Sequence, residues 1–141
     1  MDKERNIGIK VKTPEKECND KNCPFHGSLR RRGRVFVGTV IGTKMHKTAT
    51  VEWTRRYYLP KYERYEKRRT RVKVHNPSCI NAQNGDVVRI MECRPLSKTK
   101  NFVVIEKLGK ERGFKERVEA IEESKFKEVK KEENENEGSK S

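Results

Sequence analysis

The fold of this chain is decided by the stretch GDVVRIMECRPLSKTKNFVV, which covers residues 85–104. Gly85 and Asp86 favour a turn, and the valine and isoleucine side chains that follow favour a β-strand. Pro95 lacks a backbone N–H and ends that strand. A loop of lysines and hydroxyl side chains then leads to a second strand at Asn101. The stretch therefore predicts two consecutive strands joined by a basic loop.

Three further stretches upstream have the short, β-branched and aromatic composition of strands. The five predicted strands are Arg34–Gly42, Thr48–Arg56, Thr70–His75, Asp86–Arg94 and Asn101–Lys107. Among the connections, only Tyr57–Arg69 is long, and it is interpreted as either a helical turn or an extended basic loop. The absence of helical segments between the strands argues against a parallel α/β sheet. Five short strands predict an all-β barrel or sandwich, and periodicity alone does not distinguish an oligonucleotide-binding (OB) barrel from an SH3-like one.

Segments of different composition flank this body. We divide the chain into an N-terminal arm with a basic lead-in (residues 1–33), the barrel (34–107), a charged helix (108–131) and a disordered acidic tail (132–141). Ile7–Val11 alternates apolar residues in a way that is compatible with a short added strand. The chain shows neither a signal peptide, nor an apolar run of spanning length, nor a lipidation motif. We therefore expect a cytoplasmic protein that does not bind membranes.

The charge of the chain is strongly positive and unevenly distributed. Its 35 basic and 21 acidic residues give a net charge of +14, and Ser28–His75 alone holds fifteen basic and three acidic residues. Residues 110–141, in contrast, carry nine basic and ten acidic residues. A small domain needs a net charge of only about 2–8 for solubility, so this excess predicts a polyanionic partner, which we take to be nucleic acid. With 31% hydrophobic residues, the core is too small for a deep enzyme cleft.

Three segments combine cationic side chains with hydroxyl or aromatic groups: Gly42–Thr48, Arg55–Arg69 and Ser97–Lys100. Lysine and arginine reach phosphate oxygens, hydroxyls and loop N–H groups hydrogen-bond them, and tyrosine rings stack on splayed bases. The alternative for the first segment is an ordinary solvated turn, and for the second a loop whose tyrosines pack on the barrel wall. In an OB barrel the first and third segments are expected at the same rim.

The residues predicted to bind RNA are selected from these segments and from the basic positions around them. They are Arg30, Arg31, Arg32, Arg34, Lys44, His46, Lys47, Thr48, Arg55, Arg56, Tyr57, Lys61, Tyr62, Arg64, Tyr65, Arg68, Arg69, Arg71, His75, Arg94, Ser97, Lys98, Thr99 and Lys100.

The chain also resembles a known family, the ribosomal small-subunit protein family seventeen (eleven in the eukaryotic series). The most specific motif is Gly85–Ser97 with its continuation Lys98-Thr99-Lys100-x-Phe102. Upstream, the family's first hairpin is matched by Gly38-x-Val40 and Lys44-Met45-x-Lys47-Thr48, and its middle by Lys61-Tyr62-x-Arg64-Tyr65 and Val74-His75-Asn76. The arm of archaeal and eukaryotic members is matched by Lys12-Thr13-Pro14 and Cys23-Pro24-Phe25. The resemblance covers about Ile7–Lys107, and nothing is carried over to the segment after Gly109.

This resemblance implies an OB-fold barrel that is a structural constituent of the small ribosomal subunit, binds the 5′ domain of its ribosomal RNA and acts early in assembly. The implied partners are that RNA and neighbouring ribosomal proteins, without a small-molecule substrate. Two alternatives remain open. One is a free OB-fold factor that binds single-stranded nucleic acid, and the other is a zinc-dependent enzyme or redox protein.

The cysteines are the residues on which the second alternative depends. Cys18-x4-Cys23-x2-His26 offers three possible zinc ligands, with Cys79 or Cys93 as a distant fourth. The spacing is loose compared with a C-x2–4-C pair, and no second knuckle follows. We therefore expect reduced structural thiols with no metal or cofactor. No motif places a general base beside a nucleophile, so no catalytic residues are predicted.

Overall fold

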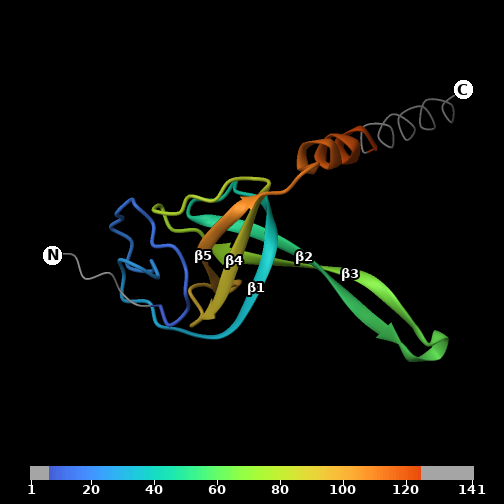
Figure 1. Ribbon diagram of the computed structural model, residues 1–141, viewed down its shortest axis with the longest axis horizontal. Coiled ribbons are helices and arrows are strands. Elements are labelled where there is room, and N and C mark those ends of the chain that lie inside the picture. The colour runs from blue at the N-terminus through green and yellow to red at the C-terminus, as the bar shows by residue number, and fades with distance from the viewer. Residues whose placement is uncertain (1–6, 125–141) are drawn as a thin grey trace, which may run out of the picture. The chain divides into compact units, whose positions relative to one another are not determined.

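The computed structural model of the protein describes residues 7–124 (Figure 1). The predicted disordered tail at 132–141 and the end of the predicted helix at 108–131 lie outside this range. The elements are β1 (Arg31–Gly42), β2 (Thr48–Leu59), the single 3-10 turn η1 (Pro60–Tyr62), β3 (Arg64–His75), β4 (Asp86–Cys93) and β5 (Lys100–Lys110). A boundary between Lys110 and Glu111 divides the chain into two compact units. No helix in residues 7–124 is long and apolar enough to cross a lipid bilayer.

The five strands form a closed barrel in the order β1-β2-β3-β5-β4, with β4 pairing back onto β1. All neighbouring strands are antiparallel except β3 and β5, which are parallel. This arrangement confirms the predicted all-β, OB-like barrel. Closure leaves no unpaired sheet edge in the barrel wall, which is one way in which small β-proteins avoid association through strand edges.

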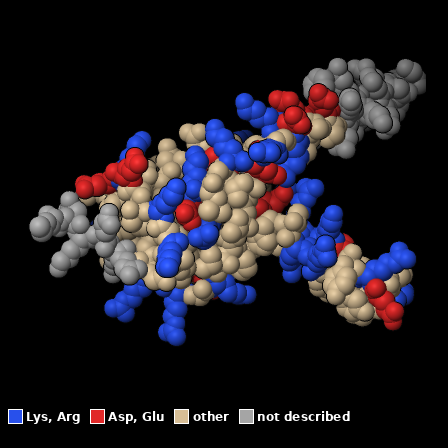
Figure 2. All heavy atoms as spheres, in the orientation of Figure 1, with Lys and Arg blue, Asp and Glu red and all other residues tan. Residues whose placement is uncertain are grey.

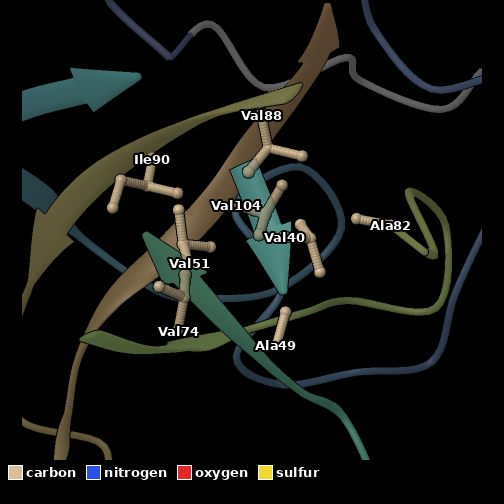
Figure 3. Close-up of a cluster of buried hydrophobic side chains, with 8 residues drawn as sticks. All are labelled: Val40, Ala49, Val51, Val74, Ala82, Val88, Ile90 and Val104. Atoms are coloured by element: carbon tan, nitrogen blue, oxygen red, sulfur yellow. The ribbon is translucent and has the colours of Figure 1, made fainter. Parts of the chain in front are cut away.

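Small aliphatic side chains fill the inside of the barrel (Figure 3). The buried cluster consists of Val40, Ala49, Val51, Val74, Ala82, Val88, Ile90 and Val104. Every strand contributes to it, because side chains that alternate along a strand place every second residue inside. Burying one such valine or isoleucine fully contributes about 1.5–3 kcal/mol. The cluster is small because the barrel is narrow, and this agrees with the low hydrophobic content of the sequence.

The N-terminal arm packs on the outer face of β4 and β5. Met91, Cys93, Val103 and Ile105 point outward there and are buried with Leu29 of the arm. The alternating piece Ile7–Val11, which is compatible with a short added strand, does not form one, since no strand occurs between residues 7 and 30. The barrel is already closed, so the arm finds no open edge to extend and contributes apolar side chains to the face instead.

The segment Tyr57–Arg69 is the largest difference between the predicted and observed elements. It does hold one helical turn, η1, but most of it is strand: β2 and β3 pair continuously from Thr48↔His75 to Leu59↔Arg64, and η1 closes the hairpin. Glu63 adopts a left-handed conformation there, with φ of 50°. Between residues 54 and 69 every residue except Leu59 is exposed. The hairpin therefore extends beyond the barrel as a twisted two-stranded ribbon (Figure 1).

The second unit begins after β5, which runs three residues past its predicted end. Gly113 makes the turn with a φ of 73°, and residues 114–124 are helical. Arg117 pairs with Glu111 at 3.1 Å, and its guanidinium carbon lies 5.4 Å from the centre of the Phe114 ring. These contacts lie within the second unit.

Candidate nucleic-acid interface

The loop between β1 and β2 and the loop between β4 and β5 lie at one rim of the barrel. The Lys100 side-chain amine donates a hydrogen bond to the Thr48 hydroxyl at 3.2 Å, although the two residues are 52 positions apart. The parallel register Lys73↔Lys100 places the start of β5 beside the end of β3. The expectation that these two loops share a rim is therefore confirmed.

The loop between β3 and β4 contributes to the same rim, which sequence reasoning did not predict. A pocket of about 600 Å³ lies between this loop and the loop between β1 and β2; its lining residues are Thr43, Lys44, Met45, His46, Lys47, Thr48, Asn76, Ser78, Asn81, Ala82 and Gln83. The Asn76 side chain holds the loop between β3 and β4 in place by donating to the Ala82 carbonyl and accepting from the Ala82 N–H, both at 3.0 Å. The only signal in the sequence was a cluster of amide and hydroxyl side chains, which is equally typical of a turn.

The predicted rim residues divide into exposed ones and buried ones. Lys44, His46, Ser97, Lys98 and Thr99 are exposed, while Lys47 and Lys100 are half-buried. Thr48 is buried, and its hydroxyl donates to the His46 carbonyl at 3.0 Å. The exposed lysines of the two loops, Lys44 and Lys98, have no carboxylate partner among residues 7–124 and remain available to phosphates.

His75 lies inside the protein rather than at the surface. Its side chain is 3% exposed, and Nε2 lies 2.9 Å from an Asp20 carboxylate oxygen of the arm. Lys47 lies 3.6 Å from the same carboxylate. Burial alone would raise the pKa of Asp20, but hydrogen bonds from the Asn22 N–H and His75, with the charge of Lys47, lower the pKa below its usual range. His75 therefore connects the arm to the rim instead of presenting a ring to RNA.

The tyrosines of the hairpin are exposed, so they do not pack on the barrel wall. Tyr57 and Tyr58 are 40% and 45% exposed, and Tyr62 and Tyr65 are 65% and 69% exposed. Large exposed aromatic groups gathered in one place mark an interaction surface. Lys61, Arg64 and Tyr62 form the tip, where the Lys61 amine lies 5.6 Å from the centre of the Tyr62 ring.

Strand pairing assigns the side chains of the hairpin to two faces, since directly opposed residues lie on the same side. One face carries the pairs Tyr58↔Tyr65, Arg56↔Lys67 and Thr54↔Arg69, and we call it the tyrosine face. The Tyr58 and Tyr65 rings are 5.2 Å apart between centres and are tilted by 53°. The face contains three cationic residues and no carboxylate. It therefore offers an aromatic pair beside uncompensated positive charge.

The opposite face of the hairpin is more nearly balanced. Arg68 pairs with Glu66 at 3.0 Å, and its guanidinium carbon lies 4.0 Å from the centre of the Tyr57 ring. Arg55 is opposed to Arg68. Tyr58 and Lys67 of the tyrosine face are absent from the predicted set, and the signal that would have found them is strand alternation, since they follow Arg56 and Tyr65 at a spacing of two.

The remaining predicted residues extend the basic surface along β1, β3 and the end of β4. Arg30 and Arg32 are exposed, whereas Arg31 is half-buried and donates to the Pro24 carbonyl. Three others contact polar groups of the protein: Arg34 lies 3.6 Å from Glu92, Arg71 lies 2.6 Å from Glu52, and Arg94 donates to Asn22 at 3.4 Å. Figure 2 shows lysine and arginine across the visible face of the barrel and along the hairpin.

Comparison with known proteins identifies a family and several relatives that are similar to this chain. The family model described as "Ribosomal protein S17" matches residues 38–106. "Small ribosomal subunit protein uS17" of Methanocaldococcus jannaschii is 61% identical over 106 residues, which cover 75% of this chain and 91% of that protein. The proteins of the same name from Methanopyrus kandleri and Archaeoglobus fulgidus are 59% and 54% identical, with 74% and 76% of this chain and 88% and 96% of those proteins covered.

Proposed function

Since this chain belongs to the ribosomal protein S17 family, a family of structural and non-enzymatic proteins of the small ribosomal subunit, we propose that its rim and tyrosine face bind the 5′ domain of the small-subunit ribosomal RNA and help that domain to fold during assembly. The protein is a structural constituent of the small subunit in the cytoplasm. Its partners there are ribosomal RNA and neighbouring ribosomal proteins. The choice of the 5′ domain comes from the family resemblance in the sequence.

The observation that carries the proposal is that cations with no carboxylate partner in the described part of the chain occur on two separate surfaces of one body. The rim presents Lys44 and Lys98, and the tyrosine face presents Arg56, Lys67 and Arg69 on the part of the hairpin beyond the barrel. Phosphate contacts position a protein on RNA, and neutralising phosphates releases counterions. A body that holds phosphates at two places fixes the relative orientation of the RNA segments that carry them.

The aromatic pair gives this binding its second component. Tyrosine rings stack on unpaired bases in loops and bulges, which are the parts of a folded RNA where bases are accessible. Tyr58 and Tyr65 lie directly opposite one another and are flanked by Arg56 and Lys67. A base that stacks on either ring would therefore have its backbone phosphate beside a cation.

A free single-strand-binding factor remains the alternative, and the location of the aromatic groups argues against it. Single-strand-binding OB folds use aromatic stacking platforms within a basic groove. Here the barrel rings Phe36, Trp53 and Phe102 are partly buried and contact one another, with Phe36 stacked on Trp53 at 4.8 Å. The exposed tyrosines lie on the hairpin beyond the barrel, where a single-stranded nucleic acid would have no groove of the barrel to bind in.

The decisive experiment is chemical footprinting of small-subunit ribosomal RNA with this protein added alone. We expect protected nucleotides within the 5′ domain, in at least two separate segments. We also expect weaker binding to single-stranded oligonucleotides of the same length. Equal affinity for both RNAs, or protection only outside the 5′ domain, would contradict the proposal.

A matched pair of variants tests the rim. The double variant Lys44→Ala with Lys98→Ala removes one exposed cation from each of two loops, whereas Arg112→Ala with Lys115→Ala removes the same charge from the second unit. The rim variant should bind the 5′ domain more weakly, and the slope of log affinity against log salt should fall by about one unit for each lost phosphate contact. The control should retain affinity and slope. Unchanged binding in the rim variant would remove the rim from the interface.

A further inference from the structure

Four metal-binding side chains converge between the arm and the barrel. They are Cys18, Cys23 and His26 of the arm and Cys79 of the loop between β3 and β4, and we call them the Cys3His cluster. Their ligand atoms all lie within 4.8 Å of one another. Cys79 is more than fifty positions from the other three in sequence, so only the fold brings the set together. Cys93, the other candidate fourth ligand, is buried in a different cluster beneath the arm.

Three of the separations between these atoms are close to those of tetrahedral zinc, and all the others lie within 4.8 Å. The Cys23 sulfur lies 3.5 Å from the Cys79 sulfur and 3.5 Å from Nδ1 of His26, which lies 3.4 Å from the Cys18 sulfur. Bonds of about 2.3 Å from zinc to sulfur and about 2.0–2.1 Å to nitrogen, arranged tetrahedrally, separate the ligand atoms by about 3.5–3.8 Å. Three thiols and one imidazole form a closed ligand set that is typical of structural zinc sites.

The backbone around Cys23 is already shaped for a metal ligand. The N–H groups of Phe25 and His26 both donate to the Cys23 sulfur at 3.4 Å, which stabilises a thiolate, the form that binds metals. Gly27 completes this tight turn, because a Cβ there would lie 2.4 Å from the Lys21 carbonyl oxygen. The sequence Cys23–Gly27 thus folds back on the preceding residues and directs both of its ligands to one point.

We propose that the Cys3His cluster binds one structural zinc ion, which fastens the N-terminal arm to the loop between β3 and β4. The metal has no catalytic role, because four protein ligands leave no open position for water or substrate. Its effect is to hold the arm in place. The arm also meets this loop through a small apolar cluster around Phe25 and Ile80, and it meets the end of β3 through the Asp20–His75 hydrogen bond. The same loop lines the rim pocket, so the metal also fixes one wall of the candidate interface.

Metal analysis of the reduced, full-length protein tests the proposal directly. After expression with added zinc and purification without chelator, we expect one zinc per chain by mass spectrometry of the elements. Addition of Co²⁺ to the metal-free reduced protein should give the visible absorption of tetrahedral cobalt with thiolate ligands. Less than a tenth of an equivalent of zinc together with no cobalt absorption would overturn the proposal. A Cys23–Cys79 disulfide in the isolated protein, with no metal bound after reduction, would overturn it as well.

Two buried cysteines provide a matched comparison, since Cys79 and Cys93 are both 8% exposed. Cys79→Ser should lose the zinc equivalent and weaken the cobalt absorption, whereas Cys93→Ser should keep both. An unchanged cobalt spectrum in Cys79→Ser would exclude Cys79 as a ligand and overturn the four-ligand site. The wild-type metal content and cobalt spectrum decide the question even where a variant does not fold. All of these readouts are independent of RNA binding.

Discussion

At the scale of single residues, burial divides the residues predicted to bind RNA into two groups. Lys44 and Lys98 are exposed and available to phosphates, while Thr48 and His75 are buried and hold the rim together through hydrogen bonds. The sequence predicted all four as RNA contacts because each lies beside a basic loop. It could not show that Asp20 of the arm would meet His75, because that contact depends on how the arm packs.

At Gly38 the addition of a single carbon atom, the Cβ of alanine, is expected to lower the stability of the barrel. A Cβ at this position would lie 2.7 Å from the Glu52 carbonyl oxygen and 2.8 Å from a Val51 methyl group. Gly38→Ala therefore forces β1 and β2 apart, and overpacking of this kind typically costs about 1–3 kcal/mol of unfolding free energy. Urea unfolding monitored by the fluorescence of Trp53 would measure it.

Gly109 is the matched control for this prediction. A Cβ there meets nothing within 4 Å. Gly109→Ala should leave the unfolding midpoint unchanged or raise it slightly, because alanine restricts the unfolded chain. Equal midpoints for the two variants would show that β1 and β2 can separate at Gly38 without cost.

At the scale of elements, the predicted strands were correct at their centres and too short at the hairpin. The apolar alternation that identifies a strand stops near Trp53, where the barrel core ends. Beyond that point β2 and β3 are held by pairing with one another, and pairing between two charged stretches leaves no hydrophobic pattern to read. The prediction of a basic, aromatic segment was right about its surface, but it missed the regular backbone that places Tyr58 opposite Tyr65.

This arrangement predicts the effect of removing the tyrosine pair. Tyr58→Ala with Tyr65→Ala should lower affinity for the 5′ domain by about 1–3 kcal/mol for each stacked base that is lost. Both rings are exposed, so thermal stability of the barrel should change little. Filter binding and thermal unfolding of the same preparations provide the two measurements.

Replacing the same pair by phenylalanine serves as the control for stacking. Tyr58→Phe with Tyr65→Phe keeps both rings and should retain most of the affinity. An equal loss in both double variants would identify the hydroxyls as the contact, and wild-type affinity in the alanine variant would exclude the pair from the interface.

At the scale of the whole molecule, the sequence predicted the barrel and its partner class but not the distant contacts that complete them. Turn residues and strand composition indicated five strands, and the charge of Ser28–His75 indicated a polyanion. The sequence favoured structural thiols over a metal site and so did not predict the Cys3His cluster. Spacing along the chain showed Cys18, Cys23 and His26 as possible zinc ligands, while Cys79 and Cys93 were equivalent in sequence and are distinguished by the fold alone. Contacts that span more than fifty residues leave no local signature.

The strand pairing of the barrel also predicts the order in which the strands pair during folding. β1 with β2 and β2 with β3 pair as neighbours in sequence, whereas the pairing of β1 with β4, as in Phe36↔Ile90, joins strands far apart in the chain. Closing a longer loop costs more chain entropy, so local pairs form first. Pulsed hydrogen exchange during refolding should therefore protect amides of the hairpin base before the amides that join β1 to β4. Simultaneous protection in one phase would contradict this order. Because β4 is also synthesised last of these strands, a growing chain can present its hairpin to RNA before its barrel exists.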